Sequence, residues 1–181
     1  MAVTRSLFRT ASVHEDSPES IVTTINEAMA DMNDSDMFVT LFVGVLDMKS
    51  GQLRYCNAGH EEPLLIREKS ASLSTLPPSS SNIPVGLMSG WNFEGQETCL
   101  RSGATIFLYT DGLTEAENSS HAQFGKQRVV RTLRVALSRS SAPKDIIAHQ
   151  TEVLHRFVAG AEQSDDLTML AIRYRKGEAE A

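Results

Sequence analysis

Two acidic positions of this sequence could do chemistry, because each adjoins an apolar run that is typical of a buried strand. Asp111 follows residues 105–109 after one threonine, and the pair Asp165 and Asp166 directly precedes residues 167–172. A carboxylate at the end of a buried strand extends from the sheet edge while the strand keeps its backbone rigid. Sites made only of carboxylate oxygens select hard cations such as Mg²⁺ or Mn²⁺, and the sequence has no His/Cys cluster with zinc spacing.

These positions also have a purely structural interpretation. Asp111 followed by Gly112 is typical of a turn after a strand, and Asp165 with Asp166 is typical of a solvated loop. Judged by residue type alone, the structural interpretation is favoured over metal binding.

The hydrophobic pattern predicts the elements that position these residues. Ser17, Pro18 and Glu19 announce a helix, since they supply a cap, a first-turn proline and a first-turn acid. Residues 68–82, rich in serine, are expected to form an exposed loop and to be the main site of disorder. The other expected elements are helices over 1–10, 17–33, 129–137 and 143–157, and strands over 38–46, 53–56, 63–66, 91–100, 105–109 and 167–172.

This order of elements does not repeat a βαβ unit, so it predicts an α+β fold with largely antiparallel sheets. The 181 residues, 41% of them hydrophobic, are enough for one domain with a sizeable core. The net charge of −6 argues against a nucleic-acid partner.

Targeting and redox signals are weak. No apolar run is long enough to cross a bilayer and no signal peptide is evident, so a soluble, cytoplasmic chain without a membrane partner is expected. Cys56 and Cys99 fit reduced thiols better than a disulfide, although a bridge between them stays open. The Arg- and Ser-rich first dozen residues have two interpretations, an organelle transit peptide or the tail of a helix.

Four segments, taken in order, resemble the PPM, or protein phosphatase 2C-like, family in its bacterial branch typified by the sporulation stage II E (SpoIIE) phosphatase. The resemblance extends from Met1 to about Tyr174, and it favours the helical interpretation of the first residues. The segments are 38–47 (FVTLFVGVLD), 53–65 with Asn57-Ala58-Gly59-His60 inside it, 107–116 (FLYTDGLTEA) and 164–170 (SDDLTML).

The resemblance implies a PPM phosphatase-like β-sandwich of two mainly antiparallel sheets flanked by helices and lacking its first strands. The domain would span residues 1–175, with 176–181 as a frayed tail. The implied reaction is hydrolysis of phosphoserine or phosphothreonine at two Mn²⁺ or Mg²⁺ ions roughly 3.5–4 Å apart, without a covalent phosphoenzyme.

Carried over residue by residue, the resemblance makes Asp111 and Asp165 metal ligands and assigns no separate catalytic side chain. Four further residues are expected around these ligands, namely Asp166, Asn57, His60 and Gly112. Thr168 is expected to hydrogen-bond in the loop beneath Asp165, while Gly86 is expected to serve the conformation of its own loop.

The sequence departs from the family in one respect that bears on activity. The Gly-Asp-Val-Ser-Gly type segment, whose aspartate bridges both metals, has no match, and Asp34, Asp36 and Asp47 lie in other elements. Two carboxylates alone hold such ions weakly, so weak or absent activity is expected. Missing strands would also expose a sheet edge, which predicts a homodimer through that edge; a monomeric mass by light scattering would contradict it.

Two functions are therefore compared. The first is a phosphatase that acts on a phosphorylated regulatory protein of the anti-anti-sigma type. The alternative is a noncatalytic protein-binding module, a pseudophosphatase, in sigma-factor or stress signalling.

Overall fold

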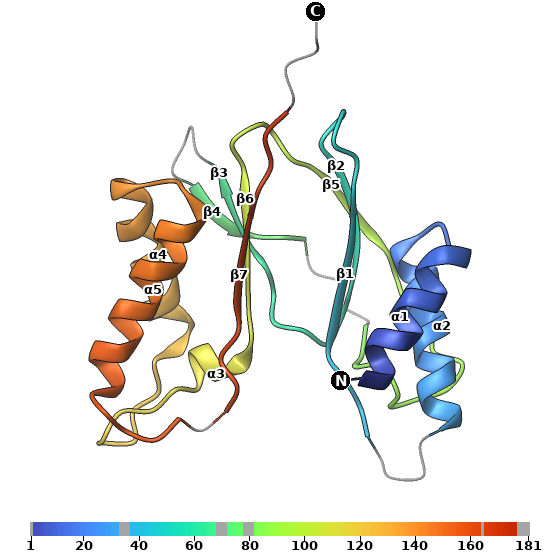
Figure 1. Ribbon diagram of the computed structural model, residues 1–181, viewed down its shortest axis with the longest axis horizontal. Helices are drawn as coiled ribbons and strands as arrows, with labels where there is room; N and C mark the ends of the chain where they lie inside the picture. The colour runs from blue at the N-terminus through green and yellow to red at the C-terminus, as the bar shows by residue number, and fades with distance from the viewer. Residues whose placement is uncertain (1, 33–36, 68–71, 78–81, 164, 177–181) are drawn as a thin grey trace, which may run out of the picture. The chain divides into compact units, whose positions relative to one another are not determined.

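The computed structural model describes residues 2–32, 37–67, 72–77, 82–163 and 165–176, and Figure 1 shows the order of its elements along the chain. Two units are formed: Met1–His60 with Pro77–Leu100, and Glu61–Leu76 with Arg101–Ala181. Asn33, Asp34, Asp36, Ser164 and residues 177–181, named in the sequence predictions, lie outside the described residues.

The first unit begins with two helices, α1 (Ala2–His14) and α2 (Pro18–Asp31). The predicted helix start is confirmed, because the Ser17 hydroxyl accepts a hydrogen bond from the Ser20 amide at 3.2 Å. Helix α1 continues past the predicted residue 10 to His14, with Ala11 buried in the same core as Val22.

A three-stranded antiparallel sheet completes this unit, in the order β1-β2-β5. Its strands are β1 (Leu41–Leu46), β2 (Gln52–Ala58) and β5 (Gln96–Cys99). The hairpin of β1 and β2 is confirmed, and its turn is closed by the Asp47 carboxylate, which accepts from the amides of Lys49 and Ser50 at 2.7 and 3.1 Å. Those hydrogen bonds lower the pKa of Asp47.

Two predicted strands of this unit are shorter than expected. Residues 38–40 precede β1 instead of belonging to it, and Phe38 is exposed, so the prediction of one buried strand from 38 was wrong there. Residues 91–95 are also not a strand. The Asn82 side-chain amide binds both the N–H and the C=O of Glu94, at 2.8 and 2.9 Å, and thus takes the place of a strand partner.

The second unit is built on a four-stranded antiparallel sheet in the order β4-β3-β6-β7 (Figure 1). The predicted strands here are confirmed within one or two residues. Their bounds are β3 (Leu64–Arg67), β6 (Thr105–Tyr109) and β7 (Met169–Arg173). Strand β6 is central, since β3 pairs with one edge of it and β7 with the other.

Strand β4 (Ser72–Thr75) corrects the prediction of a continuous exposed loop over 68–82. Its backbone pairs with β3, Leu73 opposite Ile66, and the following Leu76 is buried. Backbone pairing does not require apolar side chains, so a serine-rich segment can add an edge strand. Residues 68–71 and 78–81 of the predicted loop lie outside the described residues.

Three helices belong to this unit: α3 (Asp111–Thr114), α4 (Gly125–Arg139) and α5 (Pro143–Val158). The predicted helices at α4 and α5 are confirmed. Their buried residues, including Val129, Leu133 and Ile146, form one core cluster with Phe107 and Tyr109 of β6. The core therefore fixes the strand that leads to Asp111.

Both cysteines are free thiols, Cys56 buried and Cys99 exposed, and burial raises the pKa of Cys56 to about 12.

Of the helices that the structure describes, none has the length and apolar character needed to cross a membrane.

One buried side chain, Asn26 of α2, anchors the loop around Gly86. Its carbonyl accepts from the Gly86 amide at 2.9 Å and its amide donates to the Met88 carbonyl at 2.8 Å. Gly86 has φ +88, and a Cβ there would lie 2.9 Å from the Met37 carbonyl oxygen. The conformational role expected of Gly86 agrees with this geometry.

We expect Asn26→Ala to lower the free energy of unfolding by about 1–3 kcal/mol, because it removes the two hydrogen bonds that the buried Asn26 side chain makes to the loop backbone. Urea denaturation measures the change. The matched control is Asn92→Ala at an exposed position, expected within about 0.5 kcal/mol of wild type. Equal stability of the two variants would show that the Asn26 hydrogen bonds do not hold the loop.

Candidate metal and phosphate site

The loop before β7 is attached to the end of β6 through Thr110. The register that pairs Tyr109 with Met169 continues by one residue, so that the Thr110 amide donates to the Thr168 carbonyl at 3.1 Å. The Thr110 hydroxyl donates to the Asp166 carbonyl at 2.8 Å and accepts from the Thr168 amide at 2.9 Å. Three hydrogen bonds from one residue therefore fix the backbone beside Asp165.

Gly112 lets the same loop approach helix α3 closely. A Cβ at Gly112 would lie 2.6 Å from the Asp166 carbonyl oxygen and 3.3 Å from that of Asp165. A carbon atom at 2.6 Å from a backbone oxygen is a clash, so only glycine fits without moving the loop. The structure thus brings Asp111, Gly112, Asp165 and Asp166, four of the predicted site residues, into one place.

The two predicted ligands have carboxylates with acceptor capacity to spare. Asp111 is exposed at the first position of α3, and its Oδ1 accepts from the Gly112 amide at 3.0 Å. Asp165 is also exposed, and its Oδ1 accepts from the Asp166 amide at 2.7 Å. Within the described part of the chain, Oδ2 of neither residue accepts a hydrogen bond, so one oxygen of each is open to a ligand.

This donor set suits a hard cation, because it consists of carboxylate oxygens. However, this donor set contains only the two aspartate side chains. Across the residues that the structure describes, no group of three His, Cys, Asp or Glu side chains could hold a metal ion. Asp111 and Asp165 are therefore carboxylates of the type that such ions prefer, but a firmly held ion would require further donors.

Tyr109 and two glutamates lie next to this end of β6. Burial raises the pKa of the Tyr109 hydroxyl well above its usual range, and the negative charges of Glu61 and Glu62 raise it further. The hydroxyl therefore stays neutral at physiological pH. Glu62 also forms an ion pair with Lys126 at the start of α4, with 2.9 Å between Oε2 and Nζ.

Asn57 and His60, predicted to surround the ligands, belong to the first unit and form a turn there. The Asn57 side chain donates to the His60 carbonyl and accepts from the His60 amide, both at 2.9 Å. Between them, Gly59 has φ +73, and a Cβ on it would lie 2.5 Å from the Pro84 ring. These contacts give Asn57 and Gly59 a conformational role, while the placement of His60 near a metal stays a prediction.

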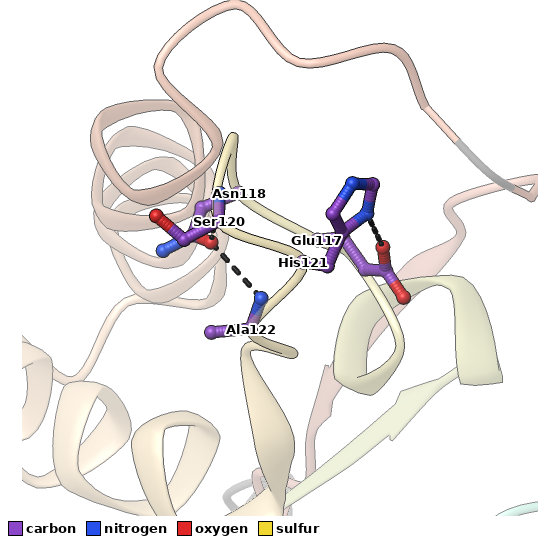
Figure 2. A network of polar contacts seen from close by, with 5 residues as sticks. All are labelled: Glu117, Asn118, Ser120, His121 and Ala122. Carbon is purple, nitrogen blue, oxygen red and sulfur yellow. Dashed lines mark hydrogen bonds and ion pairs between the residues drawn. The ribbon is translucent and has the colours of Figure 1, made fainter.

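A short polar loop links α3 to α4, and Figure 2 shows its contacts. The Asn118 side-chain oxygen accepts from the amides of Ser120 and Ala122, each at 3.0 Å. His121, with φ 58, lies 3.0 Å from the Glu117 carboxylate through its Nδ1. Phe124 is buried at the end of this loop, consistent with a packing role before α4.

Thr110 is the site residue that sequence reasoning missed. Threonine is common at the end of a β-strand, so the residue type of Thr110 does not predict that its side chain makes two hydrogen bonds to a distant loop. Its position was a usable signal, because it directly precedes Asp111. Thr168, which was expected to hydrogen-bond in the loop beneath Asp165, bonds to Thr110 through both its N–H and its C=O.

Comparison with known proteins identifies the family of the chain. Residues 1–175 match the family described as Stage II sporulation protein E (SpoIIE). The chain is 36% identical over 139 residues to Protein IcfG of Synechocystis, covering 77% of this chain and 21% of that protein. It is 24% identical over 103 residues to phosphoserine phosphatase RsbU of Bacillus subtilis, covering 57% and 30% respectively. The chain thus spans less than a third of the length of each of these two relatives.

Solved structures show the same fold. The RsbU and RsbW domains of a Mycobacterium tuberculosis protein superpose with a TM-score of 0.79 at 25% identity, covering 98% of this chain and 48% of that one. The SpoIIE phosphatase domain with a regulatory fragment, from Bacillus subtilis, gives 0.79 at 18% identity, covering 96% and 50%. The catalytic domain of the phosphatase PstP with two manganese ions gives 0.61 at 16% identity, covering 94% and 80%.

The predicted α+β fold, with two antiparallel sheets and helices, is thereby confirmed. Because the family match spans residues 1–175 of the 181, the chain belongs to the SpoIIE family of PPM-type serine/threonine phosphatases.

Proposed function

We propose that this chain provides the phosphatase domain of a protein that removes phosphate from phosphoserine or phosphothreonine of a regulatory protein, of the anti-anti-sigma type. Asp111 and Asp165 are the proposed ligands of Mn²⁺ or Mg²⁺. The observation that supports this best is the close approach at Gly112, which places both aspartates at one end of β6 and β7.

Two relatives support the reaction and the metal. The Bacillus subtilis relative RsbU is a phosphoserine phosphatase, and PstP was crystallised with two manganese ions. The chain spans only part of its curated relatives, so its substrate and activity are inferred from the site and the family together.

The residues of the chain have separable tasks in this proposal. Asp111 and Asp165 supply negative charge and oxygen donors, while Thr110 and Gly112 position the two backbones that carry them. When bound, Mn²⁺ or Mg²⁺ lowers the pKa of a bound water and neutralises charge on the phosphoryl oxygens. Rigid placement matters because catalysis by a metal site depends on ligand geometry within fractions of an ångström.

The second candidate function is a noncatalytic module that binds a regulatory protein. It is favoured by one observation, namely that no third His, Cys, Asp or Glu among the described residues joins the two aspartates. For this reason the 181-residue chain is expected to hold a metal ion weakly and to have weak or absent turnover.

Asp111→Asn tests the metal assignment. We expect Mn²⁺ affinity, measured by titration with electron paramagnetic resonance detection of free Mn²⁺, to fall about tenfold or more when this carboxylate becomes neutral. Asp31→Asn, at an exposed position in α2, is the matched control and should bind Mn²⁺ like wild type. Unchanged affinity in Asp111→Asn would remove Asp111 from the ligand set.

Phosphate release from a phosphoserine peptide, measured with Mn²⁺ on the same proteins, tests the reaction. Any turnover by the wild-type chain should disappear in Asp111→Asn and persist in Asp31→Asn. Turnover that survives in Asp111→Asn would contradict the proposed phosphatase site. Folded wild-type protein that binds Mn²⁺ yet releases no phosphate would favour the noncatalytic module.

Gly112→Ala tests the close approach. The added methyl group would clash with the Asp166 carbonyl, so we expect a loss of about 1–3 kcal/mol in unfolding free energy together with weaker Mn²⁺ binding. Gly44→Ala in β1 is the control, because a Cβ there meets its nearest neighbours at an ordinary 3.4 Å. If Gly112→Ala kept wild-type stability and Mn²⁺ affinity, the contact would not organise the site.

A further inference from the structure

Helix α4 has an unusual charge composition for this chain. Its 15 residues include no acidic residue, although the whole chain has 23 acidic and 17 basic residues. The basic residues of the helix are Lys126, Arg128, Arg131, Arg134 and Arg139.

Three of these cations have a structural explanation. Arg128 donates to the carbonyls of Gln123 and Phe124 at 2.8 and 2.9 Å, and its guanidinium lies 4.7 Å from the centre of the Phe157 ring. Lys126 pairs with Glu62. Arg139 is in the last turn, where the helix dipole favours a positive charge.

Arg131 and Arg134 have no such explanation. Both are exposed, and within the described part of the chain neither makes a hydrogen bond or an ion pair. They line an open hollow of about 520 Å³ together with Lys126, Gln127 and Val130. We call these five residues the α4 basic face.

Folding alone disfavours this arrangement. Arg128, Arg131 and Arg134 are spaced three apart, so like charges lie on neighbouring turns and each pair costs a few tenths of a kcal/mol. The first turn of α4 has no acidic residue to offset the dipole and no side-chain cap. A negatively charged partner would reduce the repulsion among these arginines, which no acidic residue of α4 offsets.

We propose that the α4 basic face docks an acidic segment of a partner protein, with Arg131 and Arg134 as its main contacts. The proposal rests on the proposed function, since a phosphatase of regulatory proteins must bind a protein surface besides the phosphorylated residue. Arg131 and Arg134 are three residues apart, which is a rise of about 4.5 Å along the helix, so carboxylates three residues apart on a partner helix have a matching spacing.

An acidic protein fits this face better than a membrane or a nucleic acid. Val129, Leu133 and Ala136 of α4 are buried in the core, and Val135 is the one large apolar residue of this helix that is exposed, so α4 presents no apolar face to a bilayer. The net charge of −6 repels the long, uniform charge of a duplex, whereas a short acidic segment contacts only the local positive patch.

The test measures binding of a fluorescently labelled peptide with Glu at every third position and Ala elsewhere, by fluorescence anisotropy at low salt. Wild type should bind it, and Arg131→Gln with Arg134→Gln should weaken binding about tenfold or more. The matched control is Arg5→Gln with Arg9→Gln, which removes two exposed arginines one turn apart on α1 and should bind like wild type. Binding should also vanish near 1 M salt, where the Debye length is about 3 Å.

Thermal unfolding separates a docking role from a structural one. The Arg131 and Arg134 double variant should melt at or above the wild-type temperature, because it removes like-charge repulsion. The peptide has no phosphate, so its binding is independent of metal and turnover, and the two proposals can fail separately. The docking proposal is overturned if wild type does not bind, if the double variant binds equally well, or if a Gln-for-Glu peptide, phosphatidylserine vesicles or duplex DNA bind as tightly.

Discussion

The candidate site depends on the contact between the end of β6 and the loop before β7. Thr110 joins the two backbones by three hydrogen bonds, and Gly112 permits an approach that any side chain would block. Asp111 and Asp165 are thereby positioned mainly by backbone geometry, and each carboxylate adds one hydrogen bond, from the next amide to its Oδ1. Oδ2 of each carboxylate accepts no hydrogen bond within the described part of the chain, so one oxygen of each stays available to the proposed metal ion.

The sheet of the second unit makes that contact possible. Strand β6 is paired on both edges, with β3 and with β7, and its Phe107 and Tyr109 are buried against the residues of α4 and α5. The antiparallel register that pairs Tyr109 with Met169 continues to Thr110 and Thr168. Core packing thus sets the position of the loop, and the loop sets the position of Asp165.

Much of this arrangement could be predicted from the sequence. Apolar runs predicted β6 and β7, and the acidic residues at their ends drew attention to Asp111 and Asp165. The resemblance to the PPM family then made these two residues the predicted metal ligands. The strand at 72–75 was missed because its serines pair through the backbone, and the strand at 91–95 was overpredicted because Asn82 binds the Glu94 backbone. The roles of Thr110 and Gly112 depend on contacts with residues more than 50 positions away, which no local pattern reveals.

The most direct test of the account is a double-mutant cycle for Mn²⁺ binding with Asp111→Asn, Asp165→Asn and the double variant. If both aspartates bind the same ion, each single substitution should remove most of the binding free energy, and the double variant should be little weaker than either single one. Additive losses, or a loss in only one single variant, would contradict the claim that the contact at Thr110 and Gly112 builds one site from two distant segments.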